Sequence, residues 1–311
     1  MSKTIGIEKI ASYIPEKKIS NFDRKDEFDI DDIFIKDKIG IQSVSRKDSD
    51  QETSDLCVKA YENLVSNYDL NSEEIEVMIV VTQNPDFNLP HTAAVVHKKL
   101  GFHENIASFD ISLGCSGFVY GLSVIESFMK SNGMKKGLLF TADPYSKVIN
   151  PDDKNTSLLF GDAAAVTLIS ENPILESGKF TFGTIGNGYE ELICTEDLYM
   201  NGRSIFNFAA RYVPVDVDSV LEKNNLTKND IDTYVFHQGS KYICDTLIRR
   251  MKLDEEKVPF DATNYGNTVS SSIPIILEKF INNQFELKKN TLICGFGVGL
   301  SWASTILKKT N

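Results

Sequence analysis

An internal repeat limits the folds that this chain can adopt more than any other feature of its sequence. Residues 70–83 and 226–238 each contain a polar turn followed by an almost continuous apolar segment, and the two copies start 156 positions apart, half of the 311-residue chain. Residues 135–140 and 288–293 repeat in the same order at nearly the same offset. Apolar runs between polar turns are typical of buried strands. The repeat therefore predicts two similar halves, although two unrelated amphipathic segments of an α/β protein would give a match this short as well.

Helical and strand patterns alternate in both halves of the chain. The predicted helices are residues 54–66, 90–99, 117–130, 216–224, 240–251 and 272–283, and the predicted strands are residues 76–82, 106–111, 137–142, 162–169, 178–185, 232–237, 291–296 and 301–308. This alternation predicts an α/β architecture with a mostly buried mixed sheet in each half. Turn residues place the boundary near residue 172, which gives an N-terminal half of residues 1–171 and a C-terminal half of residues 172–311.

The charge and hydropathy of the chain exclude several classes of protein. The net charge is −11, from 33 basic and 44 acidic residues, which argues against a nucleic-acid partner because phosphate contacts need a basic face. The first residues lack the apolar core of a signal peptide, and no apolar run approaches the roughly 18 residues of a membrane span. We therefore expect a cytoplasmic protein without a membrane partner.

The cysteines and histidines predict neither disulfides nor a metal site. Five cysteines are an odd number, they contain no CxxC pair, and the four histidines lack the spacing of metal ligands. We expect reduced thiols, no metal and no resident cofactor.

The segment around Cys115 has the pattern of a nucleophile. Residues 113–117 read Leu-Gly-Cys-Ser-Gly and lie between an apolar run and a helical pattern that begins near Phe118. A strand, a glycine turn and a helix would place the sulfur at a helix N-terminus, where free N–H groups and the helix dipole favour a thiolate. The backbone N–H of Cys115 is also a candidate oxyanion donor. A buried, inert cysteine at a strand–helix turn would have the same short motif.

Two further polar residues occupy loops in the C-terminal half. His237 ends the second copy of the repeat, directly before a helical pattern, and Asn267 lies in a polar loop before the helix that starts near Ile273. Loops at corresponding strand ends of a duplicated α/β protein converge and bind ligands, and His237 lies at such an end. A catalytic role would require Cys115, His237 and Asn267 to meet. Alternatively, His237 is an ordinary histidine at a strand end and Asn267 is a helix cap.

With these motifs the chain closely resembles the β-ketoacyl-acyl-carrier-protein synthase III branch of the thiolase superfamily, from Ile5 to Lys308. The resemblance rests on the order and spacing of the Cys115 turn, Phe-Gly-Asp-Ala-Ala-Ala at residues 160–165, His237-Gln238, Gly-Asn-Thr at residues 266–268, and Gly-Phe-Gly-Val-Gly-Leu-Ser-Trp at residues 295–302. It implies the thiolase fold, a five-layered αβαβα arrangement of two similar halves, and a homodimer.

The resemblance also implies a reaction and the roles of its residues. Cys115 would accept an acyl group from acyl-CoA or an acyl carrier protein, His237 and Asn267 would complete the triad, and the N–H groups of Cys115 and Val298 would form the oxyanion hole. Malonyl carrier protein would then lose CO₂, and its enolate would attack the acyl-cysteine to give a β-ketoacyl thioester for fatty-acid or specialised acyl-chain synthesis. A histidine Nε2–H and an asparagine amide are neutral donors suited to the enolate oxygen.

Several positions that bind substrate in the family carry other residue types here. Phe34 replaces a stacking tryptophan, Lys38 and Lys154 replace arginines, Ser240 replaces an asparagine, and Tyr242 replaces another arginine. Phenylalanine can still stack, and lysine can still contact a phosphate as a point charge, but the bidentate hydrogen bonds of arginine are lost. The affinity for coenzyme A is therefore left open.

Two more substrate contacts are implied at Leu89 and Gly202. Leu89 occupies a position where a gating aromatic residue is common, in a loop with Phe87 that reaches the acyl pocket of the family, often across the dimer. A compact leucine predicts a pocket of altered shape, and a simple packing role is the alternative. Gly202 matches a glycine whose backbone approaches the pantetheine arm.

A basic cluster lies on or after the helix that follows His237. We expect Lys241, Arg249, Arg250 and Lys252 to dock an acidic acyl carrier protein, because such a cluster would attract an anionic partner against the negative charge of the whole chain. The alternative is a solvated helix end with favourable C-terminal cations.

Two other functions share these motifs. An acyltransferase would pass the acyl group from Cys115 to an alcohol or amine, and a non-catalytic protein would act only as the dimer partner of a synthase. An intact triad argues against the second. Thiolases and hydroxymethylglutaryl-CoA synthases use a second cysteine or a glutamate base, for which no matching motif is present. The sequence leaves open the acyl chain length and branching, the donor carrier, the pathway and the final acceptor.

Overall fold

The apolar runs of the sequence form two central sheets, which the computed structural model describes within residues 4–310. The strands of the N-terminal sheet lie in the order β5 (Ala107–Ile111), β4 (Val77–Val81), β6 (Lys136–Ala142), β7 (Ala164–Ser170) and β1 (Gly6–Tyr13). Those of the C-terminal sheet lie in the order β12 (Thr233–Phe236), β13 (Asn290–Gly297), β14 (Ser301–Lys309) and β9 (Thr181–Thr184). The short strand β8 (Leu175–Ser177) pairs with β1 and β14 and joins the sheets at their edges.

The two sheets share one topology, as the sequence repeat predicts. In the first, β4 runs parallel to β6, β6 pairs antiparallel with β7, and β7 pairs antiparallel with β1. In the second, β12, β13, β14 and β9 repeat these three relations in the same order. The predicted boundary near residue 172 falls between β7 and β8, and the division into two domains there stays a prediction.

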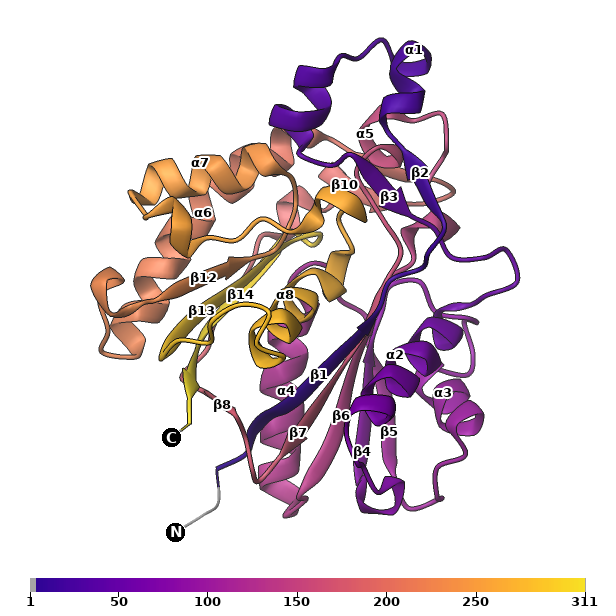
Figure 1. The fold of residues 1–311 in the computed structure, drawn as a ribbon, viewed down its shortest axis with the longest axis vertical. Helices are drawn as coiled ribbons and strands as arrows, with labels where there is room; N and C mark the ends of the chain where they lie inside the picture. The colour runs from indigo at the N-terminus through magenta and orange to yellow at the C-terminus, as the bar shows by residue number, and fades with distance from the viewer. Residues whose placement is uncertain (1–3, 311) are drawn as a thin grey trace.

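Helices complete three further layers (Figure 1). The pair α2 (Thr53–Asn67) and α3 (Thr92–Leu100) covers the outer face of the N-terminal sheet, and the pair α6 (Gly202–Lys223) and α7 (Lys241–Met251) covers the outer face of the C-terminal sheet. Between the sheets lie α4 (Gly117–Asn132) and α8 (Ser272–Ile281), which contribute apolar residues such as Phe118 and Ile276 to one core with both sheets. This is the predicted five-layered αβαβα arrangement.

Shorter elements gather at one end of the molecule, at the top of Figure 1. They are the helices α1 (Lys25–Phe28) and α5 (Lys154–Ser157), a π-helical segment at Phe34–Ile39, the strand pair β2 (Lys18–Ser20) and β3 (Ser43–Ser45), and the hairpin β10 (Leu192–Cys194) and β11 (Leu198–Met200). Short 3-10 turns lie at Phe22–Arg24, Ser72–Glu74, Tyr145–Lys147, Gly186–Glu191, Lys228–Asp230, Glu255–Lys257, Ala262–Asn264 and Val269–Ser271. No helix within residues 4–310 combines the length and the apolar character that a membrane crossing requires.

Candidate active site

Cys115 lies at the turn between the edge strand β5 and the central helix α4. The Gly117 N–H donates to the carbonyl of Gly114 at 2.7 Å, which closes the turn, and Ser116 is the N-cap of the helix. Cys115 is therefore at the N-terminal end of the helix, as the sequence predicts, and its side chain is buried.

Burial opposes ionisation of the Cys115 thiol. Desolvation, with a further contribution from the negative charge of the nearby Asp143, outweighs the hydrogen bonds from the backbone N–H groups of Val298 and Cys115, and the pKa of Cys115 is raised to about 12. The resting residue is therefore a thiol rather than the thiolate that its helix position suggested. The same two N–H groups are the predicted oxyanion donors, and both face the sulfur.

His237 enters the site from the end of β12. Its backbone N–H donates to the carbonyl of Cys294 at 2.9 Å, which extends the pairing of β12 with β13 by one residue. Its Nδ1 lies 2.8 Å from the hydroxyl of Ser272, and its ring meets the ring of Phe296 edge-on. Burial lowers the pKa of His237 to about 3. The imidazole is therefore neutral near pH 7.

Asn267 is held by backbone and side-chain hydrogen bonds. Its N–H donates to the carbonyl of Leu159 at 2.8 Å, and its carbonyl accepts from the N–H of Gly161 at 2.9 Å. A Cβ at Gly161 would lie 1.7 Å from the carbonyl oxygen of Tyr265, so only glycine permits this approach. The Asn267 Oδ1 accepts from the N–H of Val269 at 2.9 Å. Because Oδ1 already accepts this hydrogen bond, Nδ2 is the part of the Asn267 amide that remains available as a donor.

Val269 has an unusual backbone conformation beside this amide. Its φ is 53°, which places a β-branched residue in the left-handed region. Such strain persists only where the surroundings hold it, and it is often found at functional sites. Here it turns the chain between Asn267 and Ser272.

One cavity of about 710 Å³ brings the predicted triad together. Its buried end is lined by Cys115, His237 and Asn267 with Phe296 and Gly297. Leu192, Met200 and Ile205, from the β10–β11 hairpin and α6, provide apolar walls. The cavity thus joins residues from both halves of the chain, and these wall residues are ones that the sequence patterns do not predict.

The more exposed end of the cavity carries five of the predicted substrate contacts: Phe34, Lys38, Lys154, Gly202 and Ser240. The ammonium groups of Lys38 and Lys154 lie 5.3 and 5.2 Å from the centre of the Phe34 ring. Ser240 also accepts a hydrogen bond from the N–H of Ile243 and so caps α7. Arg203 lines this end as well and was not predicted, although it directly follows Gly202.

The predicted docking residues lie along α7 and at its end. Lys241 forms an ion pair with Asp245, and Arg249 contacts the hydroxyl of Thr246. Arg250 donates to the carbonyl of Ala210 on α6, and Lys252 is the left-handed C-cap of α7. Their role in docking stays a prediction.

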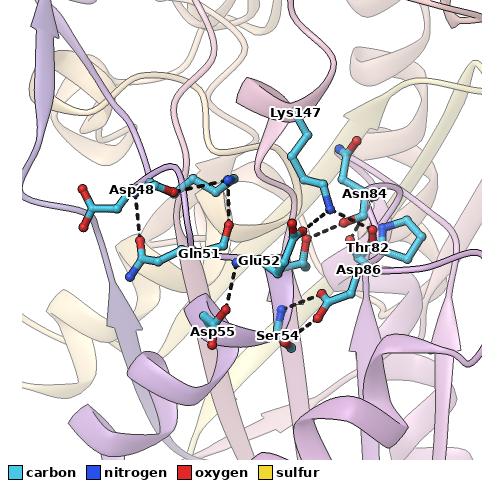
Figure 2. A network of polar contacts seen from close by, with 12 residues as sticks. Asp48, Gln51, Glu52, Ser54, Asp55, Thr82, Asn84, Asp86 and Lys147 are labelled. Carbon is cyan, nitrogen blue, oxygen red and sulfur yellow. Dashed lines mark hydrogen bonds and ion pairs between the residues drawn. The ribbon is translucent and has the colours of Figure 1, made fainter.

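The loop at residues 82–90 is fastened to the start of α2 (Figure 2). The ammonium group of Lys147 lies 2.6 Å from the carboxylate of Glu52 and donates to the carbonyl of Pro85 at 2.8 Å. Asp86 accepts hydrogen bonds from the N–H and the hydroxyl of Ser54, at 2.9 and 2.5 Å. The base of the loop is therefore ordered by charge-assisted hydrogen bonds.

Beyond this base the loop projects from the molecule. The side chain of Leu89 is 88% exposed and that of Phe87 is 56% exposed, and neither lines the cavity of its own chain. The predicted contact of Leu89 with the acyl group stays a prediction that requires a second chain.

Two buried residues beside the triad were not predicted from the sequence. Ser272 contacts His237, and Asp143, at the end of β6, accepts from the N–H of Gln83 at 2.7 Å and from the hydroxyl of Ser270 at 2.5 Å. Burial raises the pKa of Asp143 to about 6. The position of Asp143 directly after a predicted strand is the one sequence signal that pointed toward it.

The five-layered fold and a cysteine at the head of the central helix, opposed by histidine and asparagine from the second half, define a condensing enzyme of the thiolase fold. Residues 109–186 match the family described as 3-oxoacyl-[acyl-carrier-protein] synthase III, and residues 221–309 match its C-terminal domain.

Individual relatives agree with this class over the whole length of the chain. The β-ketoacyl-[acyl-carrier-protein] synthase III of Lactococcus lactis subsp. lactis is 35% identical, and the match covers 97% of this chain and 98% of that protein. Its counterpart in Caldanaerobacter subterraneus is 34% identical over 97% of each. A crystal structure of a 3-oxoacyl-(acyl-carrier-protein) synthase III superposes with a TM-score of 0.93 at 32% identity, covering 98% of this chain and 99% of that one. The chain belongs to the β-ketoacyl-acyl-carrier-protein synthase III family.

Proposed function

We propose that this protein catalyses the decarboxylative condensation of an acyl thioester with malonyl-acyl carrier protein. The observation that carries the proposal is the meeting of Cys115, His237 and Asn267 at the buried end of one cavity, with the N–H groups of Cys115 and Val298 facing the sulfur. The proposed chemistry needs only these groups and thioester substrates of coenzyme A or phosphopantetheine, without a resident cofactor.

In the first half-reaction the Cys115 sulfur attacks the carbonyl carbon of the acyl thioester. The two N–H groups stabilise the oxyanion of the tetrahedral intermediate, at about 3 kcal/mol for one such donor. The carbon–sulfur bond to the carrier then breaks, the acyl group stays on Cys115, and the proton of the Cys115 thiol ends on the departing thiol. Because burial keeps the resting cysteine protonated, the thiolate forms only as part of this step.

In the second half-reaction malonyl carrier protein enters the emptied cavity. Its carbon–carbon bond to the carboxylate breaks, CO₂ leaves, and the electron pair forms an enolate whose oxygen accepts hydrogen bonds from His237 Nε2–H and Asn267 Nδ2. The enolate carbon attacks the acyl carbon, and Cys115 leaves as a thiolate that takes up a proton from solvent to restore the resting thiol. A neutral histidine suits this step because it donates a hydrogen bond to the enolate oxygen without forming an ion pair with the malonyl carboxylate. The burial of His237 keeps it neutral.

The carrier protein is proposed to dock beside the cavity mouth. Arg203 and Lys38 lie at its exposed end, and Arg249 and Arg250 lie on the neighbouring helix α7, within a chain of net charge −11. Cations at the mouth and along α7 would attract an acidic partner and orient its phosphopantetheine arm toward Cys115.

We further propose that two chains associate along β5. This strand is an edge of the N-terminal sheet, and all five of its residues, including Phe109 and Ile111, are only partly buried. An open edge with apolar side chains favours pairing with another chain. A second copy at this edge would also cover the exposed side chains of Phe87 and Leu89.

The proposal is tested by the mass of the intact protein after incubation with a panel of acyl-CoA and acyl carrier protein thioesters. We expect one acyl adduct, lost in Cys115→Ala and retained in Cys194→Ala, which removes an exposed cysteine as a matched control. The panel also identifies the preferred donor. An adduct that survives in Cys115→Ala, or no adduct with any donor, would contradict the proposal, and the second result would favour a non-catalytic dimer partner.

A further inference from the structure

Three consecutive buried serines connect the turn after Asn267 to the ends of two strands, β6 and β12. The Ser270 hydroxyl donates to the carboxylate of Asp143 at 2.5 Å, and the Ser271 hydroxyl donates to the carbonyl of Thr141 at 2.9 Å. Both of these contacts fasten the turn to the end of β6. The third hydroxyl, of Ser272, lies 2.8 Å from Nδ1 of His237. Only this third contact reaches a member of the triad.

The Ser272 hydroxyl has two neighbours that compete for its single hydrogen. Nδ1 of His237 lies at 2.8 Å and the carbonyl oxygen of Val269 at 3.1 Å. When the hydroxyl donates to Nδ1, that nitrogen is an acceptor, and the proton of the neutral ring sits on Nε2. When it donates to the Val269 carbonyl, Nδ1 keeps its proton and Nε2 carries a lone pair. The direction of one hydroxyl therefore selects the tautomer.

The two tautomers differ in the chemistry they offer to the cavity. With Nδ1 occupied by Ser272, Nε2 is the nitrogen left to meet substrate, and the enolate of the second half-reaction needs a hydrogen-bond donor there. The Val269 carbonyl works against this arrangement, since it can take the hydroxyl hydrogen of Ser272 at 3.1 Å and thereby leave Nδ1 without a donor.

We propose that Ser272 is a positioning residue that holds His237 in the Nε2–H tautomer by donating its hydroxyl hydrogen to Nδ1. The inference rests on the proposed function, because an Nε2–H donor is required only when a malonyl-derived enolate forms. Ser272 is almost fully buried, as are His237 and Val269, so no bulk water replaces the hydroxyl in this contact.

The tautomer can be measured directly by ¹⁵N NMR of the histidine-labelled protein, which has only four histidines. We expect His237 to be in the Nε2–H form in the unaltered protein and to shift toward the Nδ1–H form in Ser272→Ala. Ser271→Ala is the matched control, because it removes a buried hydroxyl from the same turn without touching the imidazole. An Nδ1–H ring in the unaltered protein, or the same tautomer in Ser272→Ala, would overturn the proposal.

The partial reactions provide a second readout. We expect Ser272→Ala to slow malonyl decarboxylation and condensation by about 10- to 100-fold while acylation of Cys115 stays within about threefold. Ser272→Thr keeps the hydroxyl and should restore much of the condensation rate, whereas Ser272→Val, which has the same shape as threonine, should not. Equal slowing of both half-reactions would indicate a purely structural role. If the unaltered protein releases no CO₂ from malonyl carrier protein, the proposed function fails, and the NMR measurement still decides the tautomer.

Discussion

The sulfur of Cys115 and the backbone of Gly297 approach each other so closely that any side chain at residue 297 must disturb the nucleophile. A Cβ built on Gly297 would lie 2.8 Å from both the Cβ and the Sγ of Cys115. We predict that Gly297→Ala slows acylation by about 100-fold, because it displaces the sulfur from the Val298 N–H. The rate of adduct formation measures this effect. Gly186→Ala, where an added Cβ meets no atom within 4 Å, is the control, and equal rates in the two variants would refute the explanation.

The burial of a neutral His237 makes the free energy of unfolding depend on pH. Its pKa is about 3 in the folded protein against 6.5 for a free histidine, so the unfolded chain takes up a proton first as the pH falls. The stability that the neutral ring contributes is complete above pH 6.5 and declines as the pH falls toward 3. Between pH 7 and 5 this corresponds to about 2 kcal/mol.

We therefore predict that lowering the pH from 7 to 5 reduces the free energy of unfolding of His237→Gln by about 2 kcal/mol less than that of the unaltered protein. Denaturant unfolding at both pH values measures the difference. The raised pKa values of Asp143 and Glu126 have the opposite effect, because each lowers the free energy of unfolding as the pH rises. Both carboxyl groups are present in the two proteins, so their effects cancel in the comparison. His91→Gln, at an exposed histidine, is the control. Parallel pH profiles for the unaltered protein and His237→Gln would contradict the prediction.

At the scale of elements, Lys147 connects the start of α2 with the loop at residues 82–90 (Figure 2). We predict that Lys147→Met lowers the free energy of unfolding by about 1–2 kcal/mol, because a partly buried carboxylate and a carbonyl lose a charged donor. Denaturant titration measures this loss in the free energy of unfolding. Lys59→Met is the matched control, since it removes a surface ion pair with Glu62 that contacts no loop and should leave stability nearly unchanged. Equal losses would mean that the network does not hold the loop.

Elements were predictable where their pattern was continuous. The apolar runs of β4, β6, β12 and β13 and the helical spacing of α4 and α8 are confirmed within one or two residues at most ends. β1 was missed because charged residues interrupt its apolar ones although it is a central strand. The first two-thirds of α6 were missed because Pro214 lies inside the helix and normally interrupts one.

The triad was predictable from motifs, whereas its supporting residues were not. His237 lies at the end of a repeated strand, and Cys115, His237 and Asn267 all lie in family motifs, so sequence order alone points to them. Ser272 was not identified because three serines in a row share one local pattern, and only the folded turn directs each hydroxyl to a different partner. The β10–β11 hairpin, which lines the cavity, has strands too short to give a periodic signal.

At the scale of the whole molecule, the proposed dimer predicts a role for the projecting loop. We expect Leu89→Lys to weaken the dimer at least tenfold, because it places a charge where the second chain would cover an apolar side chain. Light scattering after size-exclusion chromatography measures the oligomeric state. Ile33→Lys changes another exposed apolar residue, far along the chain from β5, and should leave the dimer intact. A protein that is monomeric before any substitution would refute the dimer.

The step that decides the proposed function is the formation of a carbon–carbon bond at Cys115 by groups from both halves of the molecule. Its most direct test is a single turnover in which acylated enzyme, freed from excess donor, is mixed with malonyl carrier protein labelled in its carboxylate. We expect one labelled CO₂ for each acyl group lost from Cys115 and a carrier protein whose mass has increased by the acyl group and decreased by CO₂. Retention of the acyl group, its hydrolysis without CO₂ release, or its transfer to an added alcohol or amine would contradict the proposed condensation.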